Sequence, residues 1–142
     1  MSKSFNAGTG PLPVIGRVLL ALPFLLSGVG KLAAPEATQG YIASTSVPLP
    51  VIAYALAVIA EVGGGAMLLL GYRARLAALG LAVFSIAAAL IFHHSLGDQN
   101  QFIHFMKNVM IAGGLLQIVA FGAGSFSLDN RSAARTGVLR SA

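Results

Sequence analysis

The sequence predicts an all-α membrane protein, a four-transmembrane-helix bundle, from its composition and from the length of its apolar segments. Hydrophobic residues make up 56% of the 142 residues and charged residues only 9%, whereas a soluble domain carries about 25% charged residues. Four apolar segments follow one another, each about 20 residues long, the length that a helix needs to cross the hydrocarbon core. None of them alternates polar and apolar residues as a membrane β-strand would.

The first half of the chain contains two of the predicted spans. A polar tail, residues 1–12, precedes the first span at 13–32. Residues 33–47 are polar and predict a loop. The second span covers residues 50–71, since proline is favoured in the first turn of a helix and apolar residues follow it.

The second half contains the other two spans and a basic tail. The third span covers residues 75–93 and the fourth covers 103–123. Only a few residues separate the second span from the third, so these two helices are antiparallel neighbours. Residues 125–142 are polar and basic and predict a mobile tail, which leaves residues 13–124 as the transmembrane domain.

The basic residues predict that both ends of the chain lie in the cytoplasm. This N-in, C-in topology leaves only Lys31 and Lys107 on the outer side. Seven basic residues then lie on the cytoplasmic side, as the positive-inside rule requires: Lys3, Arg17, Arg73, Arg75, Arg131, Arg135 and Arg140. We therefore expect a multi-pass protein of the bacterial cytoplasmic (inner) membrane, with the lipid bilayer as its main partner.

Several classes of site are excluded or disfavoured by composition. The chain has no cysteine, which excludes disulfides, thiolate metal ligands and dithiol redox chemistry. Its net charge of +5 does not indicate nucleic acid, because the basic residues cap apolar segments and form no dense patch. The three histidines show no metal-ligand spacing, so no metal site is predicted.

Glu61 is the charged residue that a bilayer can least accommodate. It lies near the middle of the second span, roughly 15 Å from either interface, and its side chain is too short to reach water. An ionisable group at this depth costs about 2.5–3.5 kcal/mol. Arg17, Lys31 and Lys107 lie nearer to span ends, where long side chains can reach the interface. Glu61 must therefore be protonated, paired, or turned toward a polar cavity.

Helical spacing predicts which residues turn toward Glu61. With the polar faces turned inward, Arg17 approaches it from the cytoplasmic side. From the outer side it is ringed by Lys31, His93, Lys107 and Asn108. Two interpretations stay open: an ion pair with Arg17 or Lys107 that only fixes helix register, and a polar functional pocket. For His93, a position in the lipid headgroup region is as well supported by the sequence as a role in such a pocket.

Short motifs in a fixed order resemble those of a known family. Arg17 and His93 belong to this set, together with residues 24–32 (FLLSGVGKL), 60–64 (AEVGG), 68–78 (LLLGYRARLAA), 105–108 (FMKN) and 124–129 (GSFSLD). The chain resembles the DoxX family of small four-helix bacterial membrane proteins, which is related to the small subunit of thiosulfate:quinone oxidoreductase. This resemblance implies a quinone-related role within a membrane oxidoreductase assembly.

The leading functional hypothesis is a quinone-associated membrane subunit. Glu61 and His93 are then candidates for a proton relay, and the candidate ligand-binding residues are Arg17, Lys31, Lys107 and Asn108. No haem-ligand pattern or flavin motif is present, so no intrinsic cofactor is predicted and an oxidoreductase partner must supply the electrons. The cofactor expected under this hypothesis is a bound quinone. The alternatives are a small proton-coupled transporter, for which a homo-oligomer would supply enough helices, and a non-catalytic assembly or scaffold protein.

Overall fold

A computed structural model describes residues 10–45 and 47–140, and every element within these ranges is helical. Four helical stretches are long and apolar enough to cross a membrane. They are α1 (Leu12–Ala33), a second span made of α3 (Pro50–Val58), η1 (Ile59–Gly64) and α4 (Gly65–Leu70), then α5 (Ala74–Phe92) and α6 (Gln99–Phe121). The predicted all-α, four-span fold class is confirmed.

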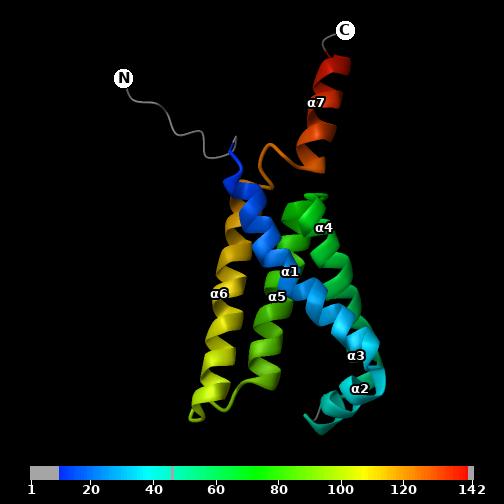
Figure 1. Cartoon of the computed structure of the whole chain (residues 1–142), viewed down its shortest axis with the longest axis vertical. Helices are drawn as coiled ribbons and strands as arrows, with labels where there is room; N and C mark the ends of the chain where they lie inside the picture. The colour runs from blue at the N-terminus through cyan, green and yellow to red at the C-terminus, as the bar shows by residue number, and fades with distance from the viewer. Residues whose placement is uncertain (1–9, 46, 141–142) are drawn as a thin grey trace.

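The spans form an elongated bundle in which α1 crosses the others obliquely (Figure 1). Its closest packing is against η1 and α4, while α5 packs along α6 over much of its length. The start of α1 and the last helix, α7 (Leu128–Arg140), lie at one end, and the α5–α6 loop lies at the other. Four spans therefore return the described chain to the end at which it started.

The core of the bundle is thin, and most large apolar side chains face outward. Leu68, Leu81 and Leu115 are fully buried where the helices meet, with small residues such as Ala78 around them. On the outside, Leu26 is 71% exposed, as are many similar residues along each span. Small residues at helix contacts and large apolar residues outside are typical of helices packed in lipid.

The segment predicted as a polar loop, residues 33–47, instead contains the helix α2 (Pro35–Ser44). Pro35 occupies the first helical position, where its missing N–H costs nothing, and Glu36 lies in the first turn, where a negative charge is favourable. Tyr41 stacks on Phe92 of α5, with ring centroids 5.8 Å apart. Helix-start signals and one aromatic contact thus order a segment that is not apolar enough to span.

The segment predicted as a mobile tail contains α7. Ser127 caps this helix, because its Oγ accepts a hydrogen bond from the backbone N–H of Asn130 at 3.2 Å. Of the predicted tails, residues 1–9 with Lys3, residues 141–142, and the side chains of Arg135 and Arg140 lie outside the described part of the structure.

The fourth span begins at Gln99 rather than at residue 103. Asp98 caps it, since its carboxylate accepts a hydrogen bond from the backbone N–H of Gln101 at 2.9 Å. A side-chain cap therefore adds one helical turn of polar sequence that hydropathy assigned to the loop.

Candidate functional site

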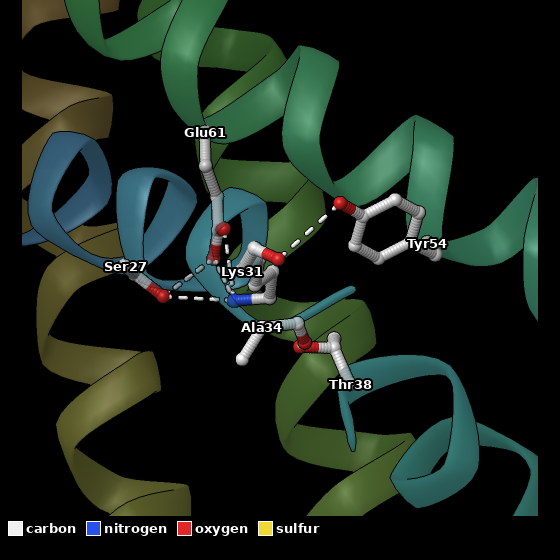
Figure 2. Close-up of polar contacts among 6 residues, drawn as sticks. All are labelled: Ser27, Lys31, Ala34, Thr38, Tyr54 and Glu61. Atoms are coloured by element: carbon white, nitrogen blue, oxygen red, sulfur yellow. Dashed lines mark hydrogen bonds and ion pairs between the residues drawn. The ribbon is translucent and has the colours of Figure 1, made fainter. Parts of the chain in front are cut away.

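Glu61 lies in the middle of the second span, with only 4% of its surface exposed, and it is paired. Nζ of Lys31 lies 2.8 Å from Oε2 and donates a hydrogen bond to Oε1 at 2.9 Å. Figure 2 shows the carboxylate of one helix pointing at the ammonium group of the other. Oε2 is buried, and its polar contact among the described residues is the one with Nζ of Lys31.

Ser27 completes a small polar cluster around this pair. Its hydroxyl donates to Oε1 of Glu61 at 3.0 Å and accepts from Nζ of Lys31 at 2.8 Å. The hydroxyl of Tyr54, on α3, donates to the backbone carbonyl of Lys31 at 3.2 Å (Figure 2). Residues 27, 31, 54 and 61, called the Glu61 cluster below, thus join α1 to α3 and η1 of the second span.

The sequence of α1 places two of these groups together. Ser27 and Lys31 are four residues apart and therefore share one face of the helix. Gly28 lies beside them at the closest approach to η1, where an added Cβ would lie 2.6 Å from Cγ2 of Val62 and 3.1 Å from Cβ of Glu61. Without a side chain at this position, α1 comes near enough for the short serine hydroxyl to reach the carboxylate.

The backbone around Glu61 is a π-helix, η1, inserted between two α-helical halves of the same span. Short π-helical segments within α-helices are rare and occur often at functional sites. Gly63 and Gly64 form part of η1 and Gly65 follows it, and the low helix propensity of glycine favours such a departure. This glycine run was the sequence signal for η1, but hydropathy alone does not reveal it.

The cluster is open on one side. Ser27 is exposed on α1, and a quarter of the Lys31 side chain is accessible. Lys31 lies in the last turn of α1, so in a bilayer this exposed side lies near the membrane interface and is open to molecules within the bilayer. The arrangement is a hydrogen-bonded acid–base pair that is buried at the carboxylate and reachable at the ammonium group.

Arg17 does not approach Glu61. Its guanidinium donates hydrogen bonds to the backbone carbonyls of Ala123 and Phe126, the latter at 2.9 Å, so it holds the segment that follows α6. The carboxylate of Asp129 in the same region accepts from the backbone N–H groups of Arg73 at 2.7 Å and Ala74 at 2.8 Å. Asp129 thereby caps α5 from a distant part of the chain, a role that sequence reasoning missed.

The remaining predicted site residues, His93, Lys107 and Asn108, lie at the end of the bundle opposite to Arg17. They make no hydrogen bond or ion pair with the Glu61 cluster. His93 shares a hydrogen bond with Gln101 at 3.0 Å and stacks on His104, with ring centroids 5.0 Å apart. Asn108 donates to the backbone carbonyl of His104 at 3.0 Å. Lys107 is exposed and has no hydrogen bond or ion pair within the described residues. Their roles in ligand binding stay predictions.

Two cavities of the structure lie away from Glu61. One of about 400 Å³ lies between α1 and α6 beside Arg17. A second, of about 720 Å³, lies at the ends of α5 and α6 beside Arg73 and Arg75. The expected polar pocket around Glu61 is therefore not confirmed, and its carboxylate is instead paired with Lys31, not with Arg17 or Lys107. Within the described ranges, no three potential metal ligands come together.

Comparison with known proteins identifies the family. A family model described as DoxX matches residues 12–94. The chain is 34% identical over 132 residues to "Inner membrane protein YphA" of Escherichia coli (strain K12), covering 89% of this chain and 94% of the relative. It is 33% identical over 119 residues to "Inner membrane protein YqjF" of the same organism, covering 82% of this chain and 88% of the relative. No solved structure gives a significant match.

These matches agree with the structure. The family match spans α1 to the end of α5 and so includes the Glu61 cluster. Four apolar helices and two inner-membrane relatives confirm the predicted inner-membrane location. The chain is a four-span inner-membrane protein that belongs to the DoxX family.

Proposed function

We propose that this protein is a quinone-associated membrane subunit of an oxidoreductase system, and that the Glu61 cluster faces the quinone headgroup. The observation that supports this most is the buried acid–base pair with one accessible side. The Lys31 side chain is partly accessible at the surface of the bundle, while the Glu61 carboxylate is held behind it. A membrane-soluble quinone would approach from that side.

Each group has a definite part in this proposal. Reduction of a quinone to a quinol consumes two electrons and two protons. Lys31 donates a hydrogen bond to a quinone carbonyl. Glu61, ionised in its pair with Lys31, takes up the two protons one after the other from water at the membrane interface and passes each to a reduced quinone oxygen through Oε2, which contacts no polar group other than Lys31 among the described residues. Ser27 and Lys31 hold Oε1. Both electrons come from a partner enzyme, because the chain contains no cysteine and no haem or flavin motif.

His93 is not needed for this arrangement. Its hydrogen bond goes to Gln101 and its ring stacks on His104, with no contact to Glu61. The proposal therefore depends on Glu61, Lys31 and Ser27.

A second candidate is a purely structural role for the ion pair. The ion pair between Lys31 and Glu61 favours it, because the two charges neutralise each other and fix the register of two helices without any ligand. A proton-coupled transporter would need a polar path to Glu61, whereas the two cavities lie beside Arg17 and Arg73. The structural role is therefore the alternative that an experiment must separate from quinone binding.

Photolabelling separates these two roles. The protein in lipid nanodiscs is exposed to a photoreactive short-chain quinone, and the labelled peptides are identified by mass spectrometry. We expect label on residues 24–32, competed by unlabelled quinone. Lys31→Met lowers it about tenfold, the order of a charge-assisted hydrogen bond.

Lys107→Met is the matched control, since it removes the same charge from an exposed and unpaired side chain. The proposal would be contradicted if the labelling were unchanged in Lys31→Met, or if it fell equally in both variants. The ion pair would then have a structural role only.

A further inference from the structure

The two cavities share a wall at the end of α6. Phe121, Gly122 and Gly124 line both of them, and Phe121 is the last residue of its span. The shared wall therefore lies where the span ends, at the level of the membrane interface. One cavity extends from this wall along the lipid-facing groove between α1 and α6, and the other extends over the start of α5.

The cavity over α5 is basic. Arg73 and Arg75 line it together with one carboxylate, that of Asp129. Two arginines and one aspartate give the lining a net charge of +1. Both oxygens of Asp129 already accept backbone hydrogen bonds. The Arg75 guanidinium lies over Gly122 and has no hydrogen bond or ion pair within the described residues. The buried hydroxyl of Ser125 also lacks a partner there.

The groove between α1 and α6 is mostly apolar. Leu20, Ile118 and Phe121 line it, and Gly114 has no side chain to fill it. Arg17 lies where the groove meets the shared wall. Its side chain is almost fully buried, yet Nε has no hydrogen-bond acceptor within the described residues. An occupant that carries an ester or phosphate oxygen at this depth would supply one.

We propose that the two cavities together bind one anionic phospholipid. Its phosphate lies between Arg73 and Arg75, its ester region lies at the shared wall, and an acyl chain lies in the groove between α1 and α6. A basic cavity beside an apolar groove, with one shared wall at the end of the spans, matches a molecule with an anionic head and a hydrocarbon tail. Basic pockets between membrane helices bind such headgroups.

This site is separate from the Glu61 cluster. Arg17 and Lys31 lie about 21 Å apart along the axis of α1, and the cluster contributes no residue to either cavity. The lipid proposal therefore does not depend on the quinone proposal.

Native mass spectrometry of the full chain in mild detergent tests the headgroup part. Phosphatidylglycerol is titrated against phosphatidylcholine with the same acyl chains. We expect phosphatidylglycerol to bind more tightly. Arg73→Gln and Arg75→Gln should each weaken it about fivefold and together about 30-fold, given about 1 kcal/mol for each arginine at a membrane surface.

Arg131→Gln is the control, because it removes an arginine that is exposed on α7 and lines neither cavity. Equal binding of the two lipids, or an equal loss in the control, would overturn the proposal. Inorganic phosphate serves as a separate probe. If it binds as tightly as phosphatidylglycerol, the site takes a soluble phosphate and the lipid proposal is wrong.

A pair of glycines tests the groove. Gly114 lies against Leu20, so Gly114→Leu fills the groove, whereas Gly113 has open space around its Cα and lies outside the lining. We expect Gly114→Leu to weaken phosphatidylglycerol binding and Gly113→Leu to leave it unchanged. Equal binding in both variants would remove the acyl chain from the groove and overturn the two-cavity arrangement.

Discussion

At the scale of single residues, the pairing of Glu61 with Lys31 shows how this protein tolerates a carboxylate deep in a bilayer. An unpaired charge at that depth costs several kcal/mol. The ammonium group at 2.8 Å and the Ser27 hydroxyl at 3.0 Å replace the lost hydration. Lys31 is also a quarter exposed, so the pair is buried at one partner only.

A double-mutant cycle measures this pairing. Lys31→Met leaves the Glu61 carboxylate without its cation and should lower the free energy of unfolding by about 3 kcal/mol. Replacing both residues, Lys31→Met with Glu61→Leu, removes the unpaired charge and should recover most of that loss. Unfolding in mixed detergent micelles, followed by circular dichroism, gives the four free energies.

Lys107→Met again serves as the control and should change stability by no more than about 0.5 kcal/mol, as is usual for an exposed side chain. Additive effects of the two replacements would show that Lys31 and Glu61 are not coupled, contrary to the contact in the structure.

Asp129 holds the other important polar contact. Its carboxylate caps α5 and binds the backbone N–H of Arg73, which has a left-handed backbone with φ of 45°. Asp129→Ala should therefore destabilise the protein by about 1–2 kcal/mol, as the loss of a helix cap does. It should also speed proteolysis in residues 124–134.

The same assays on Glu36→Gln give the reference for Asp129. Glu36 is exposed and its side chain makes no hydrogen bond or ion pair among the described residues, so the loss of its charge in the first turn of α2 should cost only about 0.3 kcal/mol. If Asp129→Ala matches Glu36→Gln in both stability and proteolysis, the cap contributes nothing measurable.

At the scale of elements, the contact between α1 and η1 depends on Gly28. A valine there would place Cβ 2.6 Å from Val62, which neither backbone can accommodate in place. Gly28→Val should separate the two helices, break the hydrogen bonds of Glu61, and destabilise the protein by about 1–3 kcal/mol.

Gly30→Val provides the comparison, since Gly30 lies on the same helix with open space at its Cβ position. Thermal unfolding of the two variants gives the difference. Equal melting temperatures would show that α1 does not approach η1 as closely as the structure has it.

The spans could be predicted from sequence, but two other helices could not. Each span is an apolar run long enough to cross a bilayer, which hydropathy detects directly. The helices α2 and α7 are polar, and local effects decide them: a proline at the first position of α2, and a serine cap at α7. The π-helix at Glu61 was missed because it changes neither length nor hydropathy.

The candidate site was predictable only in part for a related reason. Helical spacing correctly turned Lys31 toward Glu61, because each lies on a polar face of its helix. It could not decide which helices are neighbours, and so it grouped Arg17, His93 and Lys107 around the same carboxylate. In the structure, Arg17 donates hydrogen bonds to backbone carbonyls beyond α6, and His93 shares a hydrogen bond with Gln101. The periodicity within one helix does not reveal such contacts.

At the scale of the whole molecule, the described chain starts and ends at one end of the bundle (Figure 1). The basic residues predict that this end is cytoplasmic. The chain has no cysteine, so single cysteines report on each side without background. In intact cells, Ser95→Cys in the α5–α6 loop should react with a membrane-impermeant maleimide, and Ala134→Cys on α7 should react only after lysis. The opposite pattern would reverse the orientation.

The central claim, that the Glu61 cluster binds a quinone, is tested most directly by what the purified protein carries. Protein extracted in mild detergent is treated with organic solvent, and quinone is quantified by mass spectrometry for the wild type, Glu61→Gln and Lys107→Met. We predict close to one quinone per chain in the wild type and in Lys107→Met, and a loss of most of it in Glu61→Gln. No quinone in the wild type, or equal amounts in all three proteins, would contradict the claim and leave the pair as a structural key between α1 and η1.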